Sequence, residues 1–195
     1  HPPNLVPARA DLPRAAQIDL FVRQAEALAA TVARVPRAAA VPGAIADYLA
    51  ERNLPSSLRL APDDYLRALP WGERPLLAVA EGRADPSDAV SVTPAFAAVA
   101  ETGTLMLISG PAWPTTLNFL PDVHIVVLRG GQLVGPFEDA WTRLRRHAEE
   151  KGWPRAVNFI SGPSRTADIG QELIMGAHGP RRLHIVLVDD EEAAG

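Results

Sequence analysis

The sequence predicts an α/β protein with a largely parallel sheet that helices cover on both faces. Apolar runs rich in β-branched residues occur at residues 89–93, 104–109, 123–129 and 183–189. They do not alternate with polar residues, which is typical of strands buried on both faces. Helix-like patterns separate several of these runs, as in folds that build parallel sheets. The chain has 195 residues, 47% of them hydrophobic, which suits one globular domain.

The N-terminal part of the chain has helical periodicity. Residues 12–35 carry apolar side chains at i, i+3 and i+4 spacing, with Asp11 and Pro13 at a plausible start. A second amphipathic segment covers residues 41–53. We therefore expect residues 1–40 to form a tail and a helix packed on the body, and residues 41–195 to form a single α/β domain.

The remaining elements follow from local patterns. Further strands are predicted at residues 58–60, 76–80 and 156–160, and a short hairpin return at 132–135 after Gly130 and Gly131. Helices are predicted at residues 63–69, 94–101, 137–151 and 166–175. Pro94 suits a first helical turn, and Gly152 and Gly176 suit helix ends.

Composition excludes several function classes. The net charge of −4 gives no electrostatic footprint for nucleic acid. There is no cysteine, so the chain cannot hold iron–sulfur clusters through its own thiolates. Neither a metal motif nor an early GxGxxG is present, and we expect no cofactor in this chain. No apolar run approaches the roughly 20 residues of a transmembrane helix, and no signal peptide is visible, which predicts a cytoplasmic protein.

The segment NFISGPSRTADI, residues 158–169, is the first candidate site. A strand leads into a turn of small residues and then into the predicted helix, whose free N–H groups would favour an anion. Arg165 adds a planar donor suited to carboxylate or phosphate. The predicted ligand-binding residues are Gly162, Pro163, Ser164, Arg165, Thr166 and Asp168. Alternatively, Ser164 or Thr166 is only a helix N-cap, supported by Asp168.

A second loop follows the strand at residues 104–109. It offers the hydroxyl groups of Ser109, Thr115 and Thr116. Because ligands in open α/β sheets bind beyond the carboxyl ends of the strands, the two loops are predicted to face each other across one cleft. Glu101 precedes its strand and would lie at the opposite edge, unless that strand runs antiparallel.

Histidines are further candidates because an unperturbed imidazole titrates near neutrality. His178 is either a loop residue that binds backbone carbonyls or a general base. His124 and His184 begin strands, and we interpret them as structural.

Four blocks resemble the LUD-domain proteins, the lactate utilization protein C family. They are AETGTLML (residues 100–107), LPDVHIVV (120–127), GPSRTADI (162–169) and GAHGP (176–180), in the family's order. The resemblance covers roughly residues 89–189. It implies the fold shared with glucosamine-6-phosphate isomerase, ribose-5-phosphate isomerase and CoA transferases. CoA transferases of that fold use a glutamate nucleophile, which makes Glu101 a catalytic candidate beside His178.

The resemblance also implies a role in oxidising L-lactate to pyruvate together with iron–sulfur partner proteins. We expect this chain to be a non-redox subunit that binds a small carboxylate or phosphate, with Arg165 on the anion and His178 as base. Any iron–sulfur cluster would lie in the partners, since the chain lacks cysteine. Two alternatives stay open. One is a stand-alone transferase, isomerase or ligase acting on a CoA thioester or a phosphorylated substrate. The other is a non-catalytic assembly subunit.

Overall fold

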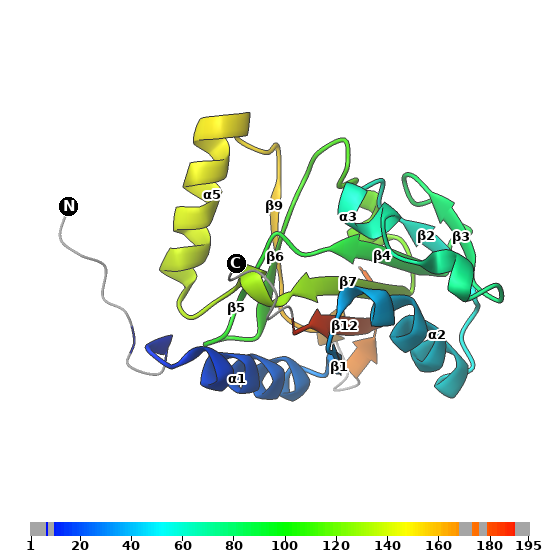
Figure 1. The fold of residues 1–195 in the computed structure, drawn as a ribbon, viewed down its shortest axis with the longest axis horizontal. Coiled ribbons are helices and arrows are strands. Elements are labelled where there is room, and N and C mark those ends of the chain that lie inside the picture. The colour runs from blue at the N-terminus through cyan, green and yellow to red at the C-terminus, as the bar shows by residue number, and fades with distance from the viewer. Residues whose placement is uncertain (1–6, 8–9, 168–172, 176–178, 190–195) are drawn as a thin grey trace.

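The centre of the protein is a six-stranded, wholly parallel sheet (Figure 1). The computed structural model describes residues 7, 10–167, 173–175 and 179–189, with residues 165–167 and 173–175 as backbone only. In spatial order the strands are β1 (Thr31–Val35), β12 (Arg182–Val188), β7 (Val123–Arg129), β4 (Val90–Pro94), β2 (Ser57–Leu60) and β3 (Ala78–Glu81). The predicted α/β class and parallel sheet are confirmed.

The central strands β7 and β12 are almost wholly buried. Alternate residues point to opposite faces. Ile125 and Val127 join the core that contains Ile45 and Leu49 of helix α2 (Val41–Glu51). Val126 and Leu128 join the core that contains Phe21 of helix α1 (Arg14–Ala27). The apolar runs lack polar alternation because both faces are covered.

The predicted N-terminal helix ends earlier than expected. Helix α1 stops at Ala27, Ala29 adopts a left-handed φ of 65°, and residues 31–35 form β1. The prediction of helix through residue 35 is therefore wrong beyond residue 27, because the strand's Val32 happened to continue the helical spacing. Helix α1 buries Phe21 and Ala25. Residues 31–35 belong to the sheet rather than to an extension.

A second, four-stranded sheet packs beside the first and is mixed. Its order is β8 (Leu133–Val134), β5 (Ala97–Val99), β6 (Thr104–Ile108) and β9 (Val157–Ile160). Strand β6 runs antiparallel to both β5 and β9. Helix α5 (Phe137–Lys151) covers this sheet with Ala140 and Leu144, and Gly152 follows it with φ 83° as predicted for a helix end.

Two predicted elements are replaced by strands of this second sheet. Residues 97–99 form β5 instead of a helix, because burial between β6 and β8 overrides the helix preference of their alanines. Residues 133–134 pair in parallel with β5, so the predicted hairpin return from β7 is wrong. Gly130 and Gly131 lie in a short 3₁₀ turn.

The predicted helix over residues 166–175 is also wrong. Where the structure describes this segment, it forms two antiparallel strands, β10 (Arg165–Ala167) and β11 (Leu173–Met175). Arg165 pairs with Met175 and Thr166 with Ile174. The β-branched Thr166 and Ile174 suit strands better than a helix.

The other elements are short. They are the helices α3 (Asp64–Arg67) and α4 (Thr116–Phe119), and 3₁₀ turns at Ala38–Ala40, Trp71–Glu73 and Gly130–Gln132. Within the described residues, no helix combines the length and apolar character needed to cross a bilayer.

Candidate functional site

The two loops predicted to share a cleft lie at opposite ends of the β6–β9 pair. After β6, Ser109 donates its N–H to the carbonyl of Ala156, just before β9, at 2.9 Å. At the other end, the hydroxyl oxygens of Ser161 and Thr104 are 2.8 Å apart. The carboxyl-end rule holds for parallel strands, and these two are antiparallel. The prediction that the loops face each other is therefore wrong.

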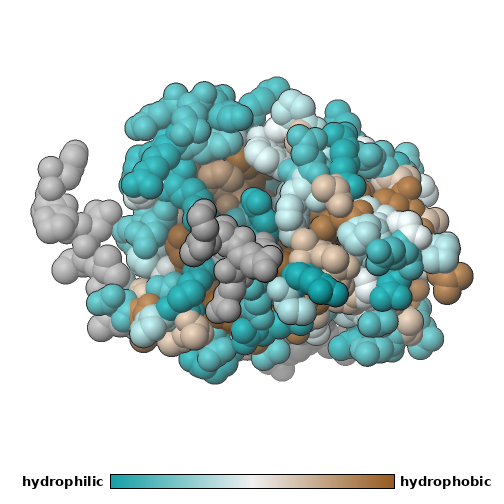
Figure 2. All heavy atoms as spheres, viewed as in Figure 1, coloured by the Kyte–Doolittle hydropathy of each residue, from teal (hydrophilic) through white to brown (hydrophobic). Residues whose placement is uncertain are grey.

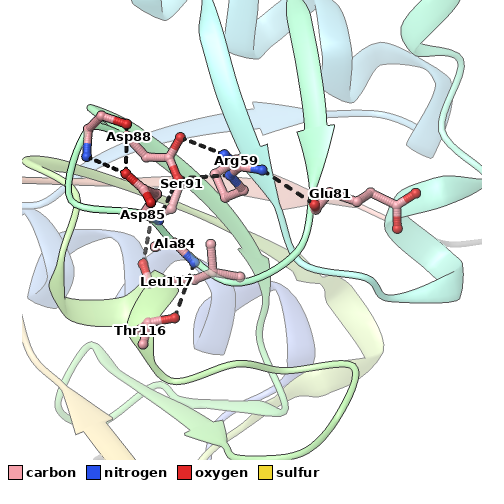
Figure 3. Close-up of polar contacts among 9 residues, drawn as sticks. Arg59, Glu81, Ala84, Asp85, Asp88, Ser91, Thr116 and Leu117 are labelled. Carbon is pink, nitrogen blue, oxygen red and sulfur yellow. Dashed lines mark hydrogen bonds and ion pairs between the residues drawn. The ribbon is translucent and has the colours of Figure 1, made fainter.

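Two hydroxyl groups of the loop after β6 hold the backbone in place. Ser109 Oγ accepts a hydrogen bond from Ala156 N–H at 2.8 Å. Thr116 Oγ1 accepts one from Ala84 N–H at 3.1 Å, as Figure 3 shows beside the Ser91–Leu117 contact. Thr115 precedes α4 without a side-chain cap bond. These contacts give Ser109 and Thr116 structural roles, and ligand binding by the three residues stays a prediction.

The loop at residues 161–164 is joined instead to other blocks of the sequence. Thr102 donates to Thr104 at 2.8 Å, and Thr104 in turn contacts Ser161. Ser164 N–H donates to the carbonyl of Pro180 at 2.8 Å. A Cβ added to Gly179 would lie 3.3 Å from that of Ser164. Residues from three separate sequence blocks therefore meet at this loop.

His124, the second residue of β7, supplies a buried imidazole at the same place. Its Nε2 lies 2.7 Å from Thr93 Oγ1. Burial lowers the pKa of His124 from its usual value to about 3, so the ring is neutral near pH 7. Its Nδ1 has no hydrogen-bond partner in the described part of the chain. The sequence predicted only a structural role for this residue.

These residues line a small pocket that is open to solvent on one side, which we call the His124 pocket, of about 190 Å³. Its lining consists of Asn118, Phe119, His124, Phe159, Ile160, Ser161, Gly162, Pro163, Ser164, Gly179, Pro180 and Leu183. That volume matches about six water molecules at roughly 30 Å³ each, so it suits a ligand of about six non-hydrogen atoms. Its polar groups are one amide, one neutral imidazole and two hydroxyls. None of the described residues that line it is charged.

The remaining predicted site residues are close in sequence to residues that line this pocket. Arg165 and Thr166 follow Ser164 directly and start β10, but their side chains lie outside the described structure, as do Asp168 and His178. Because a strand follows the loop, the predicted contribution of a helix dipole is lost. Any anion at residues 162–166 would be held by loop N–H groups and by Arg165, which stays a prediction.

Glu101 lies at the same end of the β6–β9 pair as the loop at residues 161–164, since it precedes β6 and β6 runs antiparallel to β9. Its side chain is buried, and Oε1 accepts a hydrogen bond from Phe137 N–H at 3.1 Å, at the start of α5. Glu101 is not among the residues that line the His124 pocket. The contact favours a role in fixing α5, and a catalytic role is an untested prediction.

His184 is structural, as its position at a strand start suggested. Its ring stacks on Tyr48 with centroids 3.8 Å apart, and Nδ1 lies 2.8 Å from Thr31 Oγ1. Burial, and then the charge of Arg52, lower the pKa of His184 to about 4. No cluster of three potential metal ligands occurs among the residues that the structure covers.

The backbone of Gly162 fixes the loop against the end of α1. Its φ is +85°, and an added Cβ would collide with the carbonyl oxygen of Leu28. We expect Gly162→Ala to lower the free energy of unfolding by more than the roughly 1–2 kcal/mol of a left-handed backbone alone. Gly131→Ala is the matched control, since nothing lies within 4 Å of its added Cβ. Equal urea midpoints for both variants would contradict the close packing at Gly162.

The fold and the converging blocks define a family. Residues 84–188, just over half of the chain, match the LUD domain, and the chain belongs to the LUD domain family. Among its relatives, lactate utilization protein C of Bacillus pumilus is 40% identical over 94 residues, which are 48% of this chain and 39% of that protein. Lactate utilization protein C of Exiguobacterium is 39% identical over 103 residues, 52% of this chain and 44% of that protein. An uncharacterized protein of Neisseria meningitidis is 43% identical over 90 residues, 46% of this chain and 38% of that protein. The chain thus matches less than half the length of these relatives.

A solved structure has the same fold. It is the crystal structure of a DUF162 family protein from Deinococcus radiodurans, with a TM-score of 0.68 over 91% of this chain and 99% of that chain. The sequence identity is 24%, so this likeness establishes the fold alone.

Proposed function

We propose that this chain is a component of a lactate-utilisation system and that the His124 pocket holds lactate or a similarly small 2-hydroxy acid. The observation that carries the proposal is the size and polarity of that pocket. Lactate has six non-hydrogen atoms, and the cavity of about 190 Å³ suits a ligand of that size. The names of the lactate utilization protein C relatives favour lactate over other small acids.

The lining offers complementary groups for such a ligand. His124 lines the pocket, and its buried Nδ1 lacks a partner in the described structure; we propose that a hydroxyl or carboxyl group of the ligand supplies that partner. Ser161 and Ser164 add hydroxyls, and Asn118 adds an amide. Arg165 would provide the positive charge for the carboxylate, and His178 the base for the hydroxyl proton.

Electron transfer would take place elsewhere in the system. The sequence contains no cysteine, and we propose that iron–sulfur clusters belong to partner proteins. We further propose that the architecture is the one shared with sugar-phosphate isomerases and CoA transferases, with the ligand site moved from the carboxyl edge of the sheet.

A non-catalytic assembly subunit is the second candidate, favoured by one surface feature. Trp141 of α5 and Phe159 of β9 are 38% and 39% exposed, with ring centroids 5.4 Å apart. Exposed aromatic pairs of this kind occur at protein interfaces. Loss of complex formation in a Trp141→Ser variant, with unchanged lactate affinity, would favour this role, since Trp141 does not line the His124 pocket.

Ligand size tests the first candidate. In calorimetric titrations of the purified chain, L-lactate should bind saturably and more tightly than gluconate, which is about twice as large. The reason is steric, because a ligand of roughly 13 non-hydrogen atoms exceeds a cavity of about six water volumes. Saturable binding of gluconate with none of lactate would refute this assignment of the pocket.

A further inference from the structure

A second cavity lies at the carboxyl ends of β4 and β7, whereas the His124 pocket lies at the beginning of β7. It has a volume of about 550 Å³. We call it the arginine cleft, after Arg129 and Arg143. It shares no lining residue with the His124 pocket. The two sites lie at opposite ends of β7, since His124 and Arg129 are five residues apart along that strand, about 17 Å at 3.3–3.4 Å per residue. Figure 2 shows a hollow with apolar residues between the α5 side and the α3 side of the molecule.

Two arginines line this cleft, and neither forms a salt bridge with the residues that the structure describes. Arg143 is half-buried and donates from Nη2 to the carbonyl of Gly131 at 2.8 Å. The Arg129 guanidinium lies 4.8 Å from the centroid of the Tyr65 ring. Burial, and then the charge of Arg129, lower the pKa of Arg143, while Asp139 acts weakly in the opposite direction.

The acidic residue that lines the cleft, Asp63, is already engaged. Its Oδ1 accepts the N–H groups of Tyr65 and Leu66 and so caps α3. Its Oδ2 accepts the indole N–H of Trp113 at 2.9 Å. Asp63 therefore positions a wall of the cleft. It forms no ion pair with either guanidinium, and the cleft retains a positive potential that suits an anion.

Aromatic side chains form the walls. Phe96 and Trp113 both line the cleft, and the His147 ring lies near both, with centroids 5.2 Å from Phe96 and 6.2 Å from Trp113. These contacts hold the rings in place. Flat aromatic walls with a few charged groups at one end are typical of pockets for planar small molecules.

We propose that the arginine cleft is a second ligand site, for a planar ring that carries a phosphate or carboxylate group. The ring would lie against Trp113 and Phe96, and the anion between Arg129 and Arg143. Guanidinium groups bind both anions in a planar, bidentate manner, so the two sources share one chemistry. The site lies where open α/β sheets commonly bind ligands, and it is independent of lactate binding.

Calorimetric titration of the whole chain with AMP, benzoate, adenosine and inorganic phosphate tests this proposal. AMP or benzoate should bind saturably, more tightly than adenosine and than phosphate. Arg143→Gln and Arg129→Gln should each weaken that binding at least about tenfold, because each removes a charge-assisted hydrogen bond. Arg146→Gln, an exposed arginine of the same helix that does not line the cleft, should change nothing. Thermal unfolding of each variant verifies that it is folded at the assay temperature.

Several results would overturn the proposal. One is the absence of saturable binding of both AMP and benzoate at millimolar concentration. Another is an equal loss in Arg146→Gln, which would indicate diffuse charge. Equal affinity for adenosine and AMP would exclude the anion contact, and equal affinity for phosphate and AMP would exclude the ring contact. L-Lactate affinity should be unchanged in both cleft variants, so a failed lactate titration and a failed cleft titration are separate outcomes.

Discussion

Lowering the pH from 7.5 to 5 should destabilise this protein by about 4 kcal/mol through His124 and His184. Both are buried, and their pKa values in the folded protein are lowered to about 3 and about 4. In the unfolded chain each histidine takes up a proton near pH 6.5. The unfolded state then binds more protons, so stability falls as the pH falls below 6.5 and continues to fall until the folded-state pKa values are reached. At pH 5 each contributes about 1.5 pKa units at 1.36 kcal/mol, or roughly 2 kcal/mol.

Urea unfolding at pH 7.5, 6 and 5 measures this effect. The carboxyl groups of Asp85 and Asp88 have lowered pKa values, so their contribution is lost only below the usual aspartate range and does not interfere above pH 5. His124→Gln retains an amide near the Nε2 position that contacts Thr93, and His184→Asn retains one near the Nδ1 position that contacts Thr31. Each variant should remove about half of the pH dependence, whatever its stability at pH 7.5. An unchanged dependence in the double variant would show that other groups cause it.

The parallel sheet was predictable because its central strands are apolar along their length, which is typical of strands buried on both faces. Apart from one histidine and one arginine in each, strands β7 and β12 consist of Val, Ile and Leu, and both faces are covered. Short strands such as β5 and β8 gave no such signal. They consist of two or three residues whose conformation is decided by distant partners. The β10–β11 pair was missed because its apolar residues also fit helical spacing.

The candidate site was predictable in one part only. The loop at residues 162–164 was identified from its residues and lines a cavity. Its partners were not, because the antiparallel direction of β6 and β9 cannot be read from apolar runs. A signal did exist. The blocks at residues 100–107 and 120–127 belong to the same family resemblance as the loop. The first contacts the loop through Thr104, and the second lines the same pocket through His124. Treating the blocks as spatial neighbours would have found them.

Replacing Arg165 by alanine should weaken L-lactate binding by about 10- to 150-fold. The described lining of the His124 pocket contains no charged residue, so a bound carboxylate needs a cation from the adjoining segment. Arg165 follows Ser164 directly and begins β10. A hydrogen bond between charged groups contributes roughly 1.5–3 kcal/mol, which gives the expected range. Arg165→Lys should retain part of the affinity, because an ammonium group cannot make the bidentate contact of a guanidinium.

Titration calorimetry with L-lactate measures the affinity of both variants, and Arg155→Ala provides the control. Arg155 is an exposed arginine just before β9 that does not line the pocket, so its loss changes the net charge equally without touching the proposed contact. We expect wild-type affinity in Arg155→Ala. Wild-type affinity in Arg165→Ala would mean that the carboxylate is held by neutral groups alone, such as the loop N–H groups, the two serines and His124. An equal loss in both variants would instead indicate a general electrostatic effect, and Arg165 would then have no specific part in the site.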